Sequence, residues 1–461
     1  MTERHETFVH PYIPNSAPLV RKAMLAATGA RSIEDFFQDV PADLRVEGLL
    51  DLPGPFLAEH DLERHVEGLL ARNVQPPVGL TFLGAGTYLH HVPAVVDEVI
   101  GRSEFLTAYA GEPYEDHGRF QALFEYQSLM AALLELDVVT VPTYDGFQAA
   151  GTALAMAGRA TGRPRVLLVG DVLPDKLSKV HDYVQASVGL EQIPTLDGTA
   201  DVDAVLAALG PDVAAVWVET PSAHGALEPA LAQLADAAHR HGALLVVGCE
   251  PLMLGVVEPP SVHGADIVCG DIQSLGIHPW FGGGHAGFLA VRDDPRLIME
   301  LPSRIFGLAT TDVPGEYGFG DVAYERTSFA AREDGKEWVG TAGALWGIAA
   351  GVYLALMGPE GMRELGETIL ARTAYAARRL SALPGVRLTD GAVHFRELCL
   401  DLSGSGTTAP AVVAALRRVG IEPGVPLDES NLLVCVTETT AQADIDTLAG
   451  ALRTHLEEVS R

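Results

Sequence analysis

Short apolar runs alternate with amphipathic segments through the middle of the chain. Five apolar runs begin at or near positions 165, 214, 243, 267 and 288, and turn residues or charges bound them, as expected of buried strands. Helical periodicity falls between these runs, as in residues 230–240. The alternation predicts an α/β fold with a mostly parallel sheet and helices on both faces.

Helical patterns dominate both ends of the chain. Residues 61–73 carry apolar side chains at Leu62, Val66, Leu69 and Leu70, a spacing that predicts one buried stripe on a helix. Further helices are predicted over residues 18–29, 93–100, 119–136, 341–357 and 444–457.

These elements divide the chain into three expected parts. Residues 1–75 form a helical amino-terminal arm, and residues 76–335 form a large α/β domain. Residues 336–461 contribute a linking helix and a small α+β carboxyl-terminal domain, whose strands are expected between residues 385 and 436. A chain of this length is long enough to bury a large core.

The net charge limits the classes of partner that the chain is expected to bind. The chain has 461 residues, a formal net charge of −30, and 48% hydrophobic residues. Such a charge repels phosphate backbones and anionic lipid heads, so neither a nucleic acid nor a membrane surface is an expected partner. A solvated acidic surface explains the charge without any partner.

Cysteine usage and the amino terminus predict a cytoplasmic protein. Cys249, Cys269, Cys399 and Cys435 stand singly in apolar, strand-like surroundings, so neither a disulfide framework nor a zinc site is predicted. The first residues lack the order of a signal peptide. Apolar stretches are interrupted before about 18 residues, so no membrane-spanning helix is expected.

Several common site motifs are absent from the sequence. Gly84 and Gly86 form G-x-G without a third glycine, and there is no Walker-type phosphate loop. His90 and His91 are adjacent, so they would not face one ligand together, and no metal site is predicted. The run Gly282–Gly284 fits either a close approach of the backbone to a phosphate or a simple tight turn.

The stretch at residues 266–291 carries the most specific signal. It follows the order strand, loop, glycine-rich turn, strand, and an upstream strand leads into Glu250. This layout resembles the large domain of fold-type I pyridoxal-phosphate enzymes, in which an acid after one strand holds the pyridine nitrogen and a lysine after the next forms the imine. Gln273 or Ser274 stands where that lysine belongs. A Schiff base needs a primary amine, and neither residue has one.

A wider set of segments resembles subunit 1 of the two-subunit P-protein of the glycine cleavage system. The resemblance extends from about Val9 to the last helix. Its segments, in the family's order, are YIPNSAPLVRKAMLAATGARSIEDFF, FLGAGTYLHHVPAVVDEVIGRSEFLTAY, FQALFEYQ, YDG, ADIVCGDIQSLGI and LLVCVTET.

The resemblance implies a fold-type I architecture that has lost its own coenzyme site. It also implies a homologous subunit 2 that carries the lysine and the pyridoxal phosphate, in an α2β2 assembly. In that family the enzyme decarboxylates glycine and passes the aminomethyl group to a lipoyl carrier protein.

Three departures from the family pattern predict a divergent member. The loop Ala110–Gly118 differs from the usual T-P-Y-Q-P-E-I-S-Q-G and is one residue shorter. A segment that is usually rich in Arg, Glu and His keeps Arg332 and Glu333 and little else. Glu250 stands where the family commonly has aspartate. These changes leave open a different, specialised amino-acid substrate.

Five residues are candidates for a contribution to the partner's active site. Tyr88 and His90 lie in a glycine-rich loop that resembles the family's A-Y-D-H-Y segment, and either could donate hydrogen bonds; His90 could also move protons near neutral pH. Tyr109, Glu115 and His117 lie on the loop expected to reach into the partner. Packing of these loops is the plainer explanation of the same residues.

Five more residues mark the degenerate coenzyme site. Asp145 and Gly146 form the turn that would cradle a phosphate in an active homologue, and a structural turn explains them as well. Glu250, Gln273 and Ser274 complete the set. With no lysine beside it, Glu250 is expected to be a structural remnant, and no coenzyme is expected on this chain.

Two other classes of function remain. The chain could be a free-standing pyridoxal-phosphate enzyme that uses Lys22, Lys176, Lys179 or Lys336. Lys176 and Lys179 fall in a polar segment that we expect to be exposed, whereas a catalytic lysine needs desolvation or a cationic neighbour. The chain could also be a scaffold that only stabilises or regulates its partner.

Overall fold

The structure is a computed structural model that describes residues 12–46, 48, 50–73, 80–106, 119–302, 304–337, 339 and 343–460. The chain divides into two compact units, Met1–Asn73 and Val74–Arg461. Each unit is described by itself.

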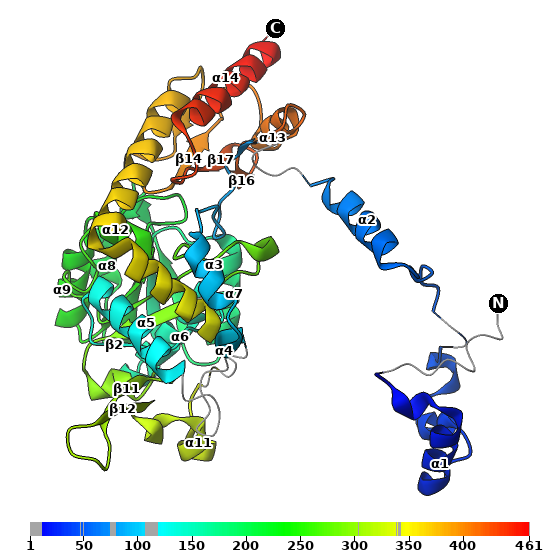
Figure 1. Ribbon diagram of the computed structural model, residues 1–461. Helices are drawn as coiled ribbons and strands as arrows, with labels where there is room; N and C mark the ends of the chain where they lie inside the picture. The colour runs from blue at the N-terminus through cyan, green and yellow to red at the C-terminus, as the bar shows by residue number, and fades with distance from the viewer. Residues whose placement is uncertain are drawn as a thin grey trace. The chain divides into compact units, whose positions relative to one another are not determined.

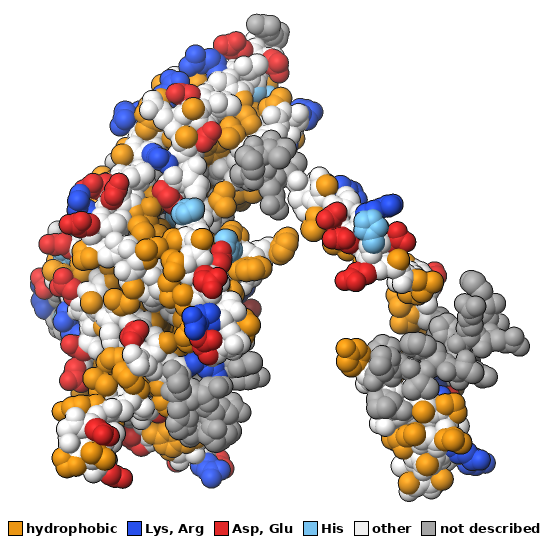
Figure 2. Space-filling view, viewed as in Figure 1, with side chains coloured by type: hydrophobic (Ala, Val, Ile, Leu, Met, Phe, Trp, Pro, Cys, Tyr) orange, Lys and Arg blue, Asp and Glu red, His pale blue; other side chains and the backbone are white. Residues whose placement is uncertain are grey.

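The described residues of the amino-terminal unit form short helices, and none of these residues is buried. Its α-helices are α1 (Pro18–Thr28) and α2 (Glu59–Leu70), and Gly29 ends α1 in the left-handed conformation. As described, neither helix has a buried residue. Within this unit by itself, the predicted stripe on α2 is not buried, because its four apolar side chains are 42% to 51% exposed. Hydrophobic side chains are visible on the surface of this unit (Figure 2).

The larger unit is built on a mixed sheet. In the described part of the chain, seven strands form this sheet in the order β2-β10-β9-β8-β7-β3-β4. β10 runs antiparallel to both neighbours and the other pairs are parallel, which confirms the expected mostly parallel sheet. The strands are β2 (Val138–Val139), β3 (Arg165–Val169), β4 (Gly189–Ile193), β7 (Val213–Thr220), β8 (Leu244–Cys249), β9 (Ile267–Asp271) and β10 (Gly287–Val291).

Helices cover both faces of this sheet, and Figure 1 shows α5, α6, α8, α9 and α12 among the helices of the larger unit. Along β3, Leu167 and Val169 join one hydrophobic cluster, whereas Val166 and Leu168 join another, because successive strand side chains point to opposite faces. The first cluster includes residues of α5, α8, α9 and α12, and the second includes residues of α6, α7 and α10. The predicted layering is therefore confirmed.

The helices α3 to α14 belong to the larger unit. α12 changes direction at Gly358, whose φ of 58° is not helical, so the helix predicted to end at residue 357 is followed by a second helical segment. The helices are α3 (Ala94–Ile100), α4 (Ser103–Leu106), α5 (Arg119–Leu134), α6 (Gly146–Thr161), α7 (Pro174–Val184), α8 (Val202–Ala208), α9 (Leu231–Arg240), α10 (Pro295–Ile298), α11 (Ser328–Ala331), α12 (Ala344–Ser381), α13 (Ala409–Arg417) and α14 (Gln442–Val459).

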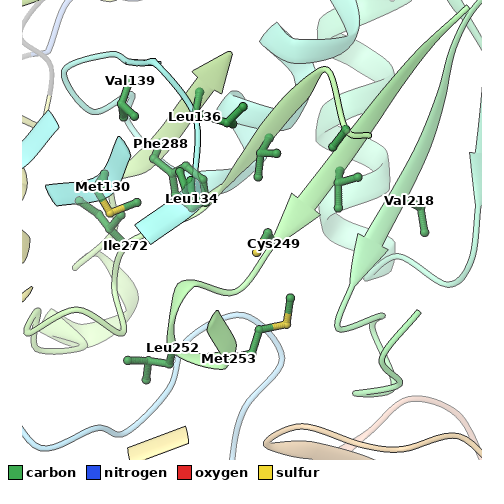
Figure 3. Close-up of a cluster of buried hydrophobic side chains, with 14 of the residues drawn as sticks. Met130, Leu134, Leu136, Val139, Val218, Cys249, Leu252, Met253, Ile272 and Phe288 are labelled. Carbon is green, nitrogen blue, oxygen red and sulfur yellow. The ribbon is translucent and has the colours of Figure 1, made fainter. Parts of the chain in front are cut away.

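Buried apolar residues fix the loop that follows β8. Cys249 and Leu252 are both in the first cluster, and they bracket Glu250 in the sequence. Figure 3 shows part of this cluster, where Met130 and Leu134 lie near Phe288. The position of the Glu250 backbone is thus set by the packing of its neighbours.

A second, antiparallel sheet forms near the carboxyl terminus. In the described residues it has the order β13-β14-β17-β16, with α13 and α14 packed in the same hydrophobic cluster. Its strands are β13 (Arg387–Leu388), β14 (Glu397–Asp401), β16 (Val425–Pro426) and β17 (Asn431–Cys435).

Short strand pairs complete the fold. β1 (Leu80–Thr81) pairs in parallel with β15 (Ile421–Glu422), and this pairing places the loop after β1 beside the second sheet. The other pairs are hairpins, β5 (Thr195–Leu196) with β6 (Thr199–Ala200) and β11 (Phe306–Thr310) with β12 (Tyr317–Asp321).

Three general features concern the sequence predictions. All four cysteines are buried, and each is a free thiol. A search of the described residues finds no helix with the length and apolarity required to cross a membrane, and no group of three or more His, Cys, Asp or Glu residues arranged to hold a metal ion.

Candidate functional site

A cavity of about 100 Å³ lies at the carboxyl ends of the parallel strands. This edge is where ligands bind in open α/β sheets. β7, β8 and β9 each contribute residues, and the second sheet contributes the turn before β14. The charged lining residues are Asp171, Lys176, Glu219, Glu250, Asp271, Arg396 and Glu397.

The loop after β9 holds the two positions where a lysine would stand in a coenzyme-binding homologue. Gln273 is buried, and its side-chain amide forms hydrogen bonds with both the N–H and the carbonyl of Tyr88. Its Oε1 accepts the Tyr88 N–H at 3.1 Å, and its Nε2 donates to the Tyr88 carbonyl at 3.0 Å. The Ser274 hydroxyl donates to Glu250 at 2.5 Å. Both side chains therefore hold loops together.

Glu250 follows β8 and is fully engaged within the chain. Its Oε1 accepts the Leu252 N–H at 3.1 Å as well as the Ser274 hydroxyl. Its Oε2 forms an ion pair with Arg396 at 2.7 Å, and the two side chains are 10% and 5% exposed. A carboxylate with these partners has little capacity left for a bound ring nitrogen.

The amino terminus of α6 is closed by two carboxylates. Asp145 caps the helix, because its Oδ1 accepts the Gln148 N–H at 2.7 Å. Asp271 Oδ2 accepts the Gly146 N–H at 2.8 Å. A Cβ on residue 146 would lie 2.9 Å from the Asp271 Cβ, so glycine permits this approach. Two of the N–H groups that could bind an anion at this helix start, those of Gly146 and Gln148, are thus bonded to the chain itself.

His285 links the same carboxylate to the loop before Tyr88. Its Nδ1 lies 3.1 Å from Asp271 Oδ2, and its Nε2 lies 2.9 Å from the Thr87 hydroxyl. Burial lowers the pKa of His285, but the hydrogen bond and charge of Asp271 together with the charge of Asp145 outweigh burial, and the pKa is raised overall. The imidazolium form is therefore favoured, and the arrangement can hold a proton beside Asp271.

Tyr88 lies between two charged residues of the second sheet. The Arg396 guanidinium carbon is 3.2 Å from the centre of the Tyr88 ring. The Tyr88 hydroxyl donates to Glu397 Oε2 at 2.8 Å, and Glu397 Oε1 accepts the Ala85 N–H at 2.7 Å. Burial raises the pKa of Tyr88 well above its ordinary value and raises the pKa of Glu397. Tyr88 thus remains a neutral donor.

His90 is buried and bonded on both ring nitrogens. Its Nδ1 lies 2.7 Å from Glu438, and its Nε2 lies 3.2 Å from an Arg396 nitrogen. Because arginine only donates, Nε2 must accept and Nδ1 must carry the proton. Burial raises the pKa of Glu438, but the contact with His90 and the bonds from backbone N–H groups together outweigh burial, and the pKa is lowered overall. This pattern assigns His90 the neutral Nδ1–H tautomer.

The other three candidates for the partner's site are outside the described residues. Tyr109, Glu115 and His117 all fall between residues 107 and 118. Their predicted roles therefore remain predictions.

Three of the four lysines of the free-standing alternative lie in the larger unit, and they have different surroundings. The prediction that Lys176 is exposed is wrong. Lys176 lines the cavity and pairs with Glu219 at 2.7 Å, and its side chain is only 12% exposed. Burial lowers the pKa of Lys176, but the neighbouring acidic groups together, Glu219 first among them, outweigh burial, and the pKa is raised overall. A protonated ammonium is not a nucleophile. Lys179 is exposed, 4.6 Å from the Phe147 ring centre, and Lys336 pairs with Glu300.

Sequence reasoning missed Arg396, Glu397, Asp271 and Lys176 as parts of this site. Asp271 is an acidic residue at the end of an apolar strand, and Glu250 directly follows another apolar strand. The pattern that identified Glu250 could therefore have identified Asp271. Arg396 and Glu397 interrupt an apolar run, and adjacent charges there indicate buried, paired side chains.

Comparison with known proteins identifies the family. A family model described as glycine cleavage system P-protein matches residues 10–452. The chain belongs to this family. It is 38% identical, over 96% of its length and 99% of the relative's, to a probable glycine dehydrogenase (decarboxylating) subunit 1 of Moorella thermoacetica. Relatives with the same name in Chlorobium limicola and Saccharolobus solfataricus are 36% and 34% identical, over 96% and 98% of this chain and 99% of each relative.

One solved structure supports the same conclusion, and a more distant one shares the fold. A glycine decarboxylase (P-protein) of the glycine cleavage system, solved in inhibitor-bound form, superposes with a TM-score of 0.83 at 35% identity and covers 97% of this chain and 99% of its own. A sphingosine-1-phosphate lyase of Burkholderia pseudomallei shares the fold with a TM-score of 0.64 at 16% identity, over 92% of this chain and 95% of its own. The fold-type I assignment is confirmed.

The residues of this chain do not fit a pyridoxal phosphate. Such a coenzyme needs a lysine, an acid for the ring nitrogen and a phosphate site. Positions 273 and 274 supply no amine, Glu250 is bonded to Arg396, and Asp271 occupies the helix start. The cavity of about 100 Å³ is also well below the roughly 300 Å³ of the smallest ordinary ligand pockets. The groups that line this cavity therefore bond to one another and offer the coenzyme no site.

Proposed function

We propose that this protein is the non-lysine-bearing subunit of a heteromeric, pyridoxal-phosphate-dependent glycine decarboxylase. Membership of the P-protein family over residues 10–452 carries the proposal, together with Gln273 and Ser274 at the positions where the lysine belongs. The relatives are named subunit 1 of glycine dehydrogenase (decarboxylating), a name that implies another subunit.

In this proposal the partner is a homologous subunit that carries the lysine and the pyridoxal phosphate, and the two form an α2β2 assembly in the cytoplasm. When bound there, the coenzyme supplies the electron sink for loss of carbon dioxide from the amino acid. A lipoyl carrier protein takes up the aminomethyl group. The engagement of Glu250 and Gly146 within this chain supports a coenzyme on the partner only.

This chain's own contribution is the wall of the partner's active site. In this proposal, Tyr109, Glu115 and His117 contribute polar groups to the partner's substrate site. Tyr88 and His90 support that wall from within, because their polar atoms contact Gln273, Glu397, Arg396 and Glu438 of this same chain. Binding groups on loops that a rigid scaffold positions are a common arrangement in enzymes.

A second candidate function is the decarboxylation of a different amino acid. The changed loop at residues 110–118 and Glu250 in place of the usual aspartate favour it. Both candidates share the partner, the coenzyme and the reaction class, and they differ only in the side chain that the active site admits.

The test is reconstitution with the lysine-bearing homologue. Full-length chain and partner are purified together, and exchange of labelled bicarbonate into glycine is measured with a lipoyl carrier. We expect activity only with both subunits. Tyr109→Phe and Glu115→Gln should each lower kcat/KM by about 10- to 100-fold, the effect of losing a hydrogen bond to a charged group. Tyr317→Phe, on an exposed strand of the β11–β12 hairpin, is the matched control.

The outcomes separate the alternatives. Activity on another amino acid but not on glycine would favour the specialised decarboxylase. Full activity in both loop variants would favour a scaffold. Covalent trapping of the coenzyme on this chain alone by borohydride would favour the free-standing enzyme, with Lys176 in the cavity as the amine to examine by peptide mapping.

A further inference from the structure

Arg396 is a buried cation in the wall of the cavity. It precedes β14, it is 4% exposed, and its φ of 66° lies in the left-handed region. A non-glycine residue in this region is strained and persists only where its surroundings hold it. The packing around Arg396 therefore holds its backbone in a conformation that differs from that of a regular strand.

Two groups contact the guanidinium of Arg396, one on its face and one at its edge. One face lies on the Tyr88 ring, at 3.2 Å from the ring centre, a stacking that suits a planar cation. On its edge, an Nη atom pairs with Glu250 at 2.7 Å. A ring over a planar cation and a carboxylate at its edge are the two contacts that a protonated pyridine ring also needs.

The remaining contacts of Arg396 join separate parts of the fold. The second Nη donates to His90 Nε2 at 3.2 Å, and His90 in turn bonds Glu438 after β17. Within the described residues, Nε is buried without a hydrogen-bond partner. One side chain thus connects the end of β8, the Tyr88–His90 loop and the second sheet.

We propose that the Arg396 guanidinium is a built-in substitute for a bound planar cation in this cleft. The pocket between Tyr88 and Glu250 is shaped for a flat, positively charged group, and the chain fills it with its own side chain. Removal of that side chain exposes a site for small planar cations such as a guanidinium or a pyridinium. This inference concerns the chain's own cleft, so it stands or falls independently of the partner subunit.

The test is chemical rescue of Arg396→Ala in the full-length chain. The substitution leaves Glu250 buried without its ion pair, so the thermal midpoint should fall by about 5–10 °C. Millimolar methylguanidinium should restore part of this loss, and so should pyridoxamine, which presents a pyridine ring without the phosphate. Neither compound should shift the wild-type midpoint, because Arg396 already fills the pocket.

Arg379→Ala is the matched control. Arg379 also pairs with a carboxylate, Asp446 at 2.7 Å, but its side chain is 39% exposed. Its loss should shift the midpoint little, and neither compound should reverse that shift. A double variant, Glu250→Gln with Arg396→Ala, removes the acid as well, and both compounds should then have no effect.

Three outcomes would overturn the inference. The first is an absence of rescue by either compound in Arg396→Ala. The second is rescue by methylguanidinium alone, which would show a pocket for arginine but not for a planar ring. The third is equal rescue in the double variant, which would show an effect unrelated to Glu250. If Arg396→Ala does not fold unaided, the yield of folded protein on refolding with and without each compound gives the same readout.

Discussion

Asp271 bonds the backbone N–H of Gly146 at 2.8 Å, so the chain's own carboxylate occupies the start of α6. The other Asp271 oxygen accepts the Gln273 N–H at 2.8 Å. Asp271 thereby fixes both the helix start and the loop where a lysine would stand in a coenzyme-binding homologue. A negative charge at a helix amino terminus is stabilising, and here the protein provides it internally.

Asp271→Ala should lower the free energy of unfolding by about 1–3 kcal/mol, because the N–H groups of Gly146 and Gln273 lose their acceptor. Urea unfolding followed by circular dichroism measures this loss. Asp182→Ala is the control, since its side chain is 74% exposed and its removal should change the value by less than about 0.5 kcal/mol. Equal effects of both substitutions would contradict the role given to Asp271.

The charge state of His285 should depend on Asp271. Asp271 raises the pKa of His285, so the folded protein binds this proton more tightly than the unfolded chain does. The resulting stabilisation is fully present below the unfolded value of about 6.5 and is lost as pH rises through the folded pKa. In an NMR titration, the His285 ring should titrate above pH 6.5 in the wild type. Asp271→Asn should bring that midpoint down, and an unchanged midpoint would exclude Asp271 as the cause.

The sequence was sufficient to predict the central sheet. The runs near positions 165, 214, 243, 267 and 288 became β3, β7, β8, β9 and β10, because buried strands between helices leave a strong hydrophobic pattern. The absence of a lysine at residues 273 and 274 was equally visible. A missing functional group can be identified from one position once the order of strands is known.

The contacts around the cavity could not be predicted in the same way. Lys176 stands in a polar segment, and only the fold places it beside Glu219. Arg396 and Tyr88 are far apart in the sequence, and their stacking depends on a left-handed backbone that no local pattern signals. Sequence periodicity reports burial along one element, whereas these contacts depend on how distant elements meet.

A restored lysine should not restore the coenzyme. In Gln273→Lys or Ser274→Lys, the new amine would still face Glu250 bonded to Arg396 and a helix start bonded to Asp271. We therefore expect neither variant, purified without its partner, to gain the visible absorbance of a coenzyme Schiff base or to be trapped by borohydride. The lysine-bearing partner subunit is the positive control. Stoichiometric trapping in either variant would show that the lysine alone was lacking.

Gly225 should be the most sensitive glycine near the site. Its φ is 86°, and a Cβ there would lie 1.9 Å from the Glu397 carbonyl oxygen. Since the Phe395 N–H also donates to the Gly225 carbonyl at 2.9 Å, a methyl group would displace the turn that carries Arg396. Gly225→Ala should therefore lower the free energy of unfolding by at least about 3 kcal/mol, the sum of overpacking and left-handed strain.

Gly162→Ala separates strain from collision. Gly162 ends α6 with a similar φ of 67°, but a Cβ there would have no neighbour within 4 Å. This substitution should cost only the left-handed strain, about 1–2 kcal/mol. Urea unfolding of both variants gives the difference that belongs to the contact with Glu397. If Gly225→Ala costs no more than Gly162→Ala, the turn before β14 can move, and the tight placement of Arg396 over Tyr88 does not depend on it.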